Sequence, residues 1–496
     1  MRRTRSSFLA RTSGFGQVAF ALWVATLLTC VSANASLRPQ FGGTLRVRIG
    51  GRVAALDPRR WPSEPTKASA TERVASLVFD RLTRLDDHGV PQPALAISWQ
   101  HDADSKRWQF RIRDAVKFSD GALLTPAIAA MALQQLLGTS FDVSAMSDSI
   151  FIQADHSIPL LLLQLSGGRY FIFHTAEDNS LSGTGPFRMA EWPAAGGPAK
   201  AVFVANEASW SGRPFVDKIE IVEGVELQQQ DDAVLFGQAD VVELPASLVR
   251  SAWQRGVRAS SSDPVELFAL GLDASRAPLQ DDRVRRAISL SIDRASIADV
   301  ILQKQGVAAG GLLPNWISGY AHLFPPTLEL AHAKELLAAS GREFSPAKPL
   351  VLIYDSGDAE ARAIADRVAV NLREAGITVR VTEQGANGKG KPPVADLHLM
   401  RHRLSSPDPA QALSELLASV GETAANMQTL EEVCSAERAA IEAFRVIPLV
   451  HVSESYGLSP QVRDWMAPRW GGWDLADVWL GPPATSGSGA SGSSVP

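Results

Sequence analysis

The segment "RIRDAVKFSDGALLTPAIAAMAL" (residues 111–133) decides the fold, because it joins a strand, a turn and a helix within 23 residues. Residues 111–113 alternate Arg, Ile and Arg, which is typical of a half-exposed strand. "SDG" (119–121) predicts a turn, since an Asp side chain bonds nearby backbone and Gly accepts positive φ. Thr125 and Pro126 are typical of the N-cap and first position of a helix. We therefore expect a strand–turn–helix unit here.

The composition indicates a large globular protein without disulfides. The chain has 496 residues, 45% of them hydrophobic and 20% charged, enough for two or three domain-sized cores. Its net charge of −5 argues against a nucleic-acid partner. It has two cysteines, Cys30 and Cys434, so the fold must be stable without a disulfide framework. We expect Cys434 to be a small packing residue on a helix rather than a nucleophile.

The N-terminus predicts export. A basic start, "MRRTRSSFLAR", precedes the apolar stretch "VAFALWVATLLTCV" (18–31) and the small residues "ANA" (33–35). This order indicates a cleaved signal peptide over residues 1–35, and hence a periplasmic protein. A membrane helix is the alternative, but it would need about 20 apolar residues. The residue before Cys30 is Thr, so we do not expect a lipid anchor at Cys30.

Local patterns predict an alternation of strands and helices. We expect a first strand in 42–51, an amphipathic helix over 71–86, a hairpin over 97–118, an irregular region over 140–180, a helix or helix pair over 281–303, and a helix over 328–341 stopped by Gly. Residues 349–384 predict a strand–helix–strand unit with parallel strands. The Gly- and Ser-rich segment 481–496 predicts a disordered tail.

Motifs for catalysis are missing from the sequence. There is no HExxH, CxxC or GxSxG. His398 and His402 are four residues apart, but on a strand they would lie too far apart to bind one metal. "GANGKGKP" (385–392) has phosphate-loop spacing without the following Ser or Thr and helix, so it predicts a hairpin loop. These features favour a binding protein over an enzyme, and we expect no cofactor and no metal site.

The opening segment resembles the signature of the family 5 solute-binding proteins, the extracytoplasmic receptors of peptide and nickel ABC importers. The matching positions are Phe110, Arg113, Val116, Lys117, Phe118, Asp120, Gly121 and Thr125. Pro126 stands where the family usually has Ala. Further segments resemble the family in order along the chain: "GGTLRV" (42–47), "GTGPFRM" (183–189), "PLQDDRVRRAISLSIDR" (278–294) and "IPLVHVSESYGLSPQV" (447–462). The resemblance covers most of residues 42–480.

This resemblance implies an α/β, two-lobe periplasmic-binding-protein fold, type II, of the large peptide-binder subclass, with a hinge between the lobes. Lobe I would comprise residues 36–265 and 447–480, and lobe II residues 266–446. The lobes would close on a small solute and deliver it to the membrane permease of an ABC importer. This solute would be a peptide or a peptide-like compound, and anionic compounds are included. The protein would be non-enzymatic and monomeric.

The resemblance also suggests where the ligand binds. Counting back from "PDP" places the amine-binding Asp of peptide binders at Ser405, which carries no charge. Arg401 and Arg403 would instead suit an anion, or they point to solvent from a strand end. His402 is a further ligand-binding candidate. The aromatic candidates are Trp316, Tyr320, Trp470 and Trp473. Gly50 and Gly51 would let a ligand approach the backbone closely, or they form a plain turn.

Three alternatives stay open. The same scaffold could hold nickel or a metal chelate, with His402 as the residue to test. An exported sensor could keep the fold and dock to a different membrane partner. An exported hydrolase is the third alternative, but it would need a nucleophile that no motif identifies.

Overall fold

The computed structural model describes residues 38–53, 55–62, 65–193, 199–227, 230–384, 394–423 and 427–482. The predicted signal peptide (1–35), the loop 385–392 and all but two residues of the predicted tail (481–496) lie outside the described residues. Residues Phe41–Pro496 form one compact unit, distinct from Met1–Gln40.

The predicted strand–turn–helix unit is confirmed. Strand β5 (Arg107–Ile112) leads to helix α3 (Pro126–Leu137), and Thr125 caps that helix by accepting the Ile128 N–H at 3.3 Å. Gly121 in the turn between them has φ +92°, a conformation that Gly adopts without strain. β5 pairs antiparallel with β4 (Ala96–His101), which confirms the predicted hairpin.

Residues 140–180 are more regular than we predicted. β6 (Asp142–Met146) and β7 (Ser149–Gln153) form a hairpin that completes a four-stranded sheet in the order β4-β5-β7-β6. Helix α4 (Leu161–Ser166) follows, and α3 covers the sheet around its own apolar core. The sequence pattern did not predict this hairpin, because β6 is mostly exposed and lacks the alternation of apolar and polar residues that is typical of a strand.

The predicted helix over 71–86 is wrong at both ends. Helix α2 spans Pro65–Ala75 and ends in a turn over 76–78, where the Gly185 N–H donates to the Val78 carbonyl at 2.9 Å. A Cβ on Gly185 would approach that backbone to 2.7 Å, so only glycine fits. Strands β2 (Thr83–Leu85) and β3 (Pro91–Pro93) follow. Tertiary pairing therefore overrides the helical periodicity of this segment.

Lobe I is built on one half of the large sheet. Its strands run in the order β10 (Phe187–Glu191), β11 (Lys200–Ala205), β12 (Lys218–Val222), β1 (Thr44–Arg48) and β13 (Val241–Leu244), with β1 parallel to both neighbours. Helices α5 (Gln230–Leu235) and α6 (Ala246–Gln254) flank β13 in the chain. Two small antiparallel pairs are formed by β8 (His174–Thr175) with β9 (Leu181–Ser182) and by β20 (Val462–Arg463) with β21 (Trp479–Leu480). The main core of this lobe lies between the sheet and α2.

Lobe II is built on the other half. β18 (Leu397–Arg403), β16 (Leu350–Asp355) and β17 (Val379–Gln384) form its sheet, and the parallel pair β16–β17 joined by α11 (Ala359–Ala375) confirms the predicted unit. One face is covered by α11, α7 (Asp282–Ser291) and α10 (Leu330–Ser340), the other by α9 (Asn315–Ser318), α12 (Pro409–Ser419) and α13 (Leu430–Glu442). Residues 281–303 give α7, then α8 (Arg294–Ser296) and a π-helical turn, η4 (Ile297–Ile301), and Cys434 packs on α13 as expected.

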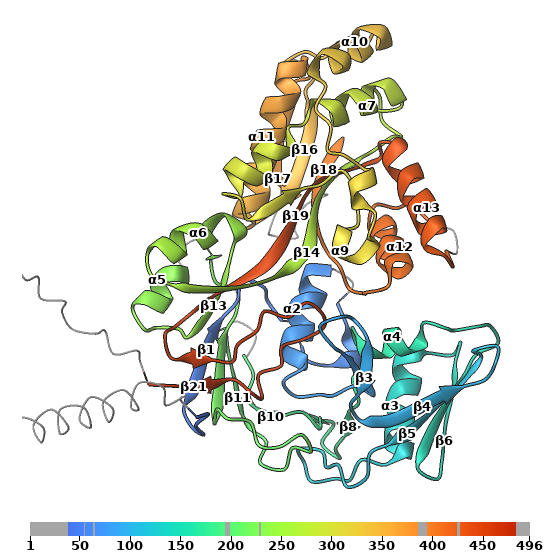
Figure 1. The fold of residues 1–496 in the computed structure, drawn as a ribbon, viewed down its shortest axis with the longest axis vertical. Helices are drawn as coiled ribbons and strands as arrows, with labels where there is room; N and C mark the ends of the chain where they lie inside the picture. The colour runs from blue at the N-terminus through green and yellow to red at the C-terminus, as the bar shows by residue number, and fades with distance from the viewer. Residues whose placement is uncertain are drawn as a thin grey trace, which may run out of the picture. The chain divides into compact units, whose positions relative to one another are not determined.

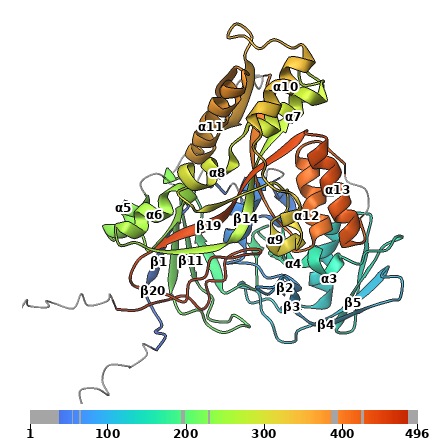
Figure 2. The same cartoon turned by 45° about the horizontal axis from the view of Figure 1, so that its top comes forward.

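Two long antiparallel strands join the lobes, β14 (Arg258–Leu272) and β19 (Val446–Leu458) (Figures 1 and 2). A short strand, β15 (Gly306–Ala308), pairs with β19. Within β14, Phe268 and Leu270 belong to one core of lobe II, and the alternating Leu267 belongs to the core on the opposite face. The register of the β14–β19 pair shifts around Pro264, so the ladder is irregular where it passes between the lobes.

Candidate functional site

A buried network of ion pairs connects the lobes beside the crossing strands. Arg73 on α2 and Arg403 on β18 both donate to the same Glu454 oxygen on β19, at 2.8 and 2.6 Å. Arg73 also pairs with Glu243 on β13. We call Arg73, Glu243, Arg403 and Glu454 the seam network. It links two elements of lobe I to a strand of lobe II through one shared carboxylate.

Glu454 is ionised at any physiological pH. Its burial by itself would raise the pKa of the carboxyl group, but Arg403 and Arg73 outweigh that effect and hold the pKa at about 2. The seam is therefore a fixed charge pattern and not an acid–base pair.

Arg401 lies two residues from Arg403 and is enclosed by carboxylates of lobe II. Its guanidinium contacts Glu266 at 2.6 Å, Asp358 at 3.3 Å and Glu360 at 3.5 Å. These three partners leave it little capacity for an anionic solute, so the prediction that Arg401 binds ligand gains no support. Neither arginine is freely solvated at a strand end, because Arg401 is paired with three carboxylates and Arg403 is only 9% exposed.

His402 points to the opposite face of β18 from these arginines. It is buried, and its Nε2 has no hydrogen-bond partner among the described residues. Burial lowers the pKa of His402 to about 4, so the ring is neutral near pH 7. Its partner across the sheet is Leu267, which is part of the core beneath α12.

Ser405 lies at the loop that follows β18. Its hydroxyl donates to Glu415 on α12, and its carbonyl oxygen would lie 3.9 Å from a Cβ on Gly167 of lobe I. The neighbouring "PDP" begins α12: Asp408 is the N-cap and accepts the Gln411 N–H at 2.8 Å. The loop thus brings lobe II against the turn after α4.

Two of the predicted aromatic residues meet across the lobes. The rings of Trp316 (α9) and Trp470 lie 5.1 Å apart, and Trp316 donates its indole N–H to the Pro264 carbonyl at 2.8 Å. Arg469 lies over the Trp316 ring at 5.1 Å and pairs with Asp263 on β14. Trp316 and Trp470 therefore sit at the same lobe boundary as Arg403 and Ser405.

The other predicted residues lie elsewhere. Tyr320 is buried in the core beneath α12, and Trp473 in the core of lobe I, where it donates to the Tyr456 hydroxyl at 3.3 Å. The Gly50 N–H donates to Glu243 of the seam network at 2.7 Å. A Cβ on Gly51 would meet Ala70 at 2.8 Å, which indicates tight packing on α2. For all of these residues, ligand contact stays a prediction.

Four buried N–H donors near the seam have no acceptor in the part of the chain that the structure describes. They are Nε of Arg73, Nε of Arg81, Nη2 of Arg403 and Nε1 of Trp470. All four side chains belong to residues that are 9% exposed. We call Arg73, Arg81, Arg403 and Trp470 the donor cluster. Buried donors normally have partners, so this cluster is a place where an acceptor group would be stabilised.

Arg81 ties the cluster to the turn after α4. Its Nη2 donates to Glu72 and to the Gly168 carbonyl, both at 2.6 Å, and its guanidinium lies 3.8 Å from the Phe171 ring centroid. Sequence inspection missed Arg73, Arg81 and Glu454. Glu454 had a signal, because it is the one carboxylate in a strand without other Asp, Glu, Lys or Arg residues, "IPLVHVSESYGL".

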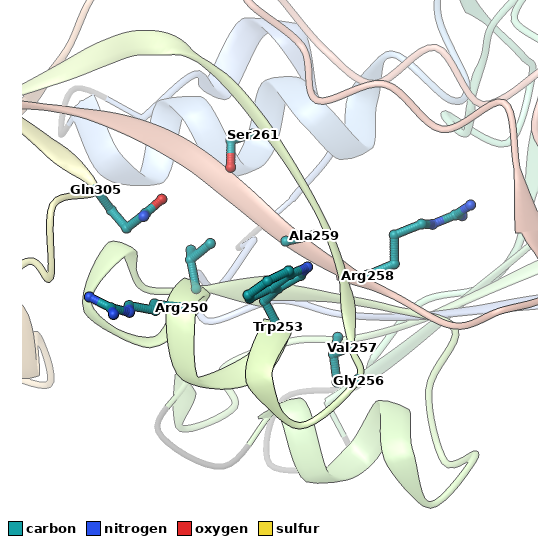
Figure 3. A pocket seen from close by; sticks show the side chains of 9 residues that line it. Arg250, Trp253, Gly256, Val257, Arg258, Ala259, Ser261 and Gln305 are labelled. Carbon is teal, nitrogen blue, oxygen red and sulfur yellow. The ribbon is translucent and has the colours of Figure 1, made fainter. Parts of the chain in front are cut away.

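Two surface pockets lie away from the seam. One, of about 570 Å³, opens between α6 and β14, and Figure 3 shows the Trp253 indole spread across it with Gln305 approaching from the other side. The second, of about 580 Å³, is lined by the other end of β18, including His398. None of the predicted ligand-binding residues lines either pocket.

Within the described ranges, no three His, Cys, Asp or Glu side chains gather in a geometry that would hold a metal ion. The helices in that part of the chain are also too short or too polar to span a membrane.

Comparisons with known proteins agree with this architecture. The chain is 26% identical over 345 residues to the nickel-binding periplasmic protein of Escherichia coli (strain K12), covering 61% of this chain and 65% of that protein. It is 25% identical over 315 residues to the probable D,D-dipeptide-binding periplasmic protein DdpA of the same strain, covering 58% and 60%. The matched region thus spans less than two thirds of either relative.

The fold recurs in solved structures. The oligopeptide-binding protein AppA from Bacillus subtilis, solved in complex with a nonapeptide, superposes with a TM-score of 0.72 over 90% of this chain and 100% of that chain, at 17% identity. This confirms the α/β two-lobe, type II fold. The model of the bacterial extracellular solute-binding proteins, family 5 Middle, matches residues 168–424, more than half of the chain. The protein belongs to the family 5 bacterial extracellular solute-binding proteins.

Proposed function

We propose that this protein is the extracytoplasmic receptor of an ABC importer, which captures a small peptide or peptide-like solute between its lobes and delivers it to a membrane permease. The observation that carries the proposal is the seam network, where Glu454 holds Arg73 of lobe I and Arg403 of lobe II. The names of the relatives, which bind nickel, dipeptides or oligopeptides, support a transported small solute.

The lobes would close by bending where the two long strands cross. The boundaries are those given above, lobe I over 36–265 and 447–480 and lobe II over 266–446, with one adjustment. Residues from Ile447 to Val452 pack in the core of lobe II, whereas Tyr456 packs in lobe I. We therefore place the second crossing between Val452 and Tyr456, opposite the irregular register near Pro264.

The receptor would bind its solute without chemical change. Its charged seam supports this, because Glu454 stays ionised and is held by two guanidinium groups, which suits a fixed electrostatic frame and not proton transfer. The protein would act in the periplasm as a monomer, exported by a signal peptide over 1–35 and not lipidated at Cys30.

A metal-chelate receptor is the second candidate, favoured by the nickel-binding relative. Calorimetric titration with nickel chloride, alone and with two equivalents of histidine, separates the candidates. Micromolar binding of either form, abolished by His402→Gln, would favour the metal function. If both titrations give only the heat of dilution, the metal-chelate function is excluded.

Capture can be tested on protein purified from the periplasm of an expression host without refolding. Native mass spectrometry after incubation with a casein digest should give peptide adducts that disappear on unfolding. Small-angle X-ray scattering should show a smaller radius of gyration with the digest, because closure makes the molecule more compact. A bare protein mass together with an unchanged radius would contradict peptide capture.

A further inference from the structure

The pocket between α6 and β14 lies on the face of the lobe I sheet that is turned away from the seam network. On β13, Val241 packs in the core with α2, which carries Arg73 of the seam, whereas Val242 packs in the core with α6. Successive side chains of a strand point to opposite faces, so α2 and α6 cover opposite faces of this sheet. At about 570 Å³, the pocket is large enough for a small organic molecule. We call it the rear pocket, and its polar and aromatic lining residues are Arg250, Trp253, Arg258, Ser261 and Gln305.

Both lobes line the rear pocket. Helix α6 and the start of β14 belong to lobe I, whereas Gln305 belongs to lobe II and directly precedes β15. Gly306 of β15 pairs with Val452, next to the second crossing. Figure 3 shows the Gln305 side chain opposite the Trp253 indole. A molecule bound here would therefore contact both lobes behind the crossing strands.

The rear pocket carries positive charge that is not neutralised by the described residues around it. Arg250 forms neither an ion pair nor a hydrogen bond in the part of the chain that the structure describes. Arg258 donates to a backbone carbonyl of β20, and burial and the charge of the neighbouring Arg463 lower its pKa. Arg255, which lies between them in the chain, pairs instead with both aspartates of α5. The charge left at the pocket favours an anion.

An exposed indole lies beside this charge. Trp253 is 69% exposed and follows Arg250 by three residues on α6, which places the two side chains on the same face of the helix. Figure 3 shows the indole between the side chains of Arg250 and Arg258. An aliphatic anion would leave the indole in water, and a neutral ring would leave the guanidinium groups without a partner. A flat ring that carries a negative charge satisfies both groups.

We infer that the rear pocket binds a planar aromatic anion, whose ring stacks on the Trp253 indole and whose charged group accepts hydrogen bonds from Arg250. This molecule is a second ligand and not the transported solute, since the pocket faces away from the seam. Contact with Gln305 of lobe II would hold the lobes in the arrangement described here. The site would exist whether or not the receptor function holds.

Calorimetric titration of the parent protein with indole-3-acetate tests the inference. Indole-3-acetamide lacks the charge and acetate lacks the ring, so both should bind about ten-fold more weakly than indole-3-acetate or not at all. Trp253→Ala and Arg250→Gln should each reduce the affinity for indole-3-acetate by about ten-fold. Gln305→Ala should reduce it about three-fold, because it removes the contact from lobe II. The three substituted side chains lie at the surface, so the variants should fold like the parent.

Two matched controls lie outside the rear pocket. Phe236→Ala removes an aromatic ring that is 73% exposed, and Arg286→Gln removes an exposed guanidinium group on α7. Both variants should bind indole-3-acetate like the parent. Equal binding by the parent and Trp253→Ala would place the probe at another site and overturn the inference. Binding of the amide as strongly as the acid, or no heat of binding with indole-3-acetate at millimolar concentration, would overturn it as well.

Discussion

Two arginines on one strand have opposite environments. Arg401 faces three carboxylates, all within lobe II, whereas Arg403 shares a single carboxylate, Glu454, with Arg73 of lobe I. The first site has more acceptors than its cation needs, and the second has donors left over. A basic residue in a binding protein therefore indicates an anion site only where its own carboxylate partners leave some of its N–H groups unpaired.

The largest effect is expected from Glu454→Gln. It removes the shared charge, which leaves Arg403 without a carboxylate partner and Arg73 with Glu243 alone, and should destabilise the protein by about 3–5 kcal/mol. Urea unfolding followed by tryptophan fluorescence measures this loss. Glu266→Gln is the matched control, since Arg401 keeps Asp358 and Glu360, and it should cost only about 1–2 kcal/mol. Equal losses would show that the two sites are not different.

The substitution Arg401→Met tests the site in lobe II, where one guanidinium is surrounded by three carboxylates. Without the cation, Glu266, Asp358 and Glu360 repel one another in a mostly buried site, and a loss of about 3 kcal/mol at pH 8 is expected. Burial already raises the pKa of Glu360, and Arg401 only partly opposes it. The variant should therefore bind protons more readily when folded than when unfolded, and recover part of its deficit relative to the parent at pH 5.

Urea midpoints of variant and parent at both pH values check this prediction. A deficit that is the same at pH 8 and pH 5 would mean that the carboxylates do not interact.

The sequence predicted the helices and strands better than the contacts of the buried charged side chains. Capping and turn residues gave the unit around Thr125 and the β16–α11–β17 unit, because these signals are local. The helix predicted over 71–86 failed because Val78 is held by Gly185, more than one hundred residues away. No local pattern carries information about such a contact.

The candidate site could be predicted only in part for the same reason. Arg403 and Ser405 were chosen from the resemblance, and Trp316 and Trp470 as aromatic residues that could line a cleft. All four lie at the lobe boundary. Arg401 was chosen on the same grounds, but its three partners come from β14 and α11 and could not be foreseen. Arg81 was not chosen at all, since its surroundings are made by loops that are distant in sequence.

Acid should weaken the packing around two buried histidines, His402 on β18 and His451 on β19, and not the seam. The pKa values of His402 and His451 are lowered to about 4 by burial, although a bond to Leu312 raises that of His451 slightly. The unfolded chain binds these protons first, near the ordinary pKa of 6.5, so stability is lost as pH falls from 6.5 towards 4. The expected loss between pH 7 and pH 5 is about 2 kcal/mol for each histidine.

Urea midpoints at pH 7 and pH 5 measure this loss, with His402→Gln as the variant that should flatten the dependence. Glu454 should not contribute in this window, because its pKa of about 2 keeps it ionised at pH 5. A steep loss that persists in a His402→Gln, His451→Gln double variant would point to the seam after all.

The smallest effect separates a satisfied indole from an unsatisfied one. Trp473 donates to the Tyr456 hydroxyl at 3.3 Å, and that hydroxyl lies 3.4 Å from Glu454, so Trp473→Phe should cost about 1 kcal/mol. Trp470 has no acceptor among the described residues, so Trp470→Phe loses no hydrogen bond and should lower the free energy of unfolding by less than Trp473→Phe does.

The two substitutions remove the same N–H from neighbouring positions of one loop, so ring size and solvation effects largely cancel between them. Equal losses in the two variants would show that the hydrogen bond from Trp473 to Tyr456 contributes nothing measurable to the free energy of unfolding.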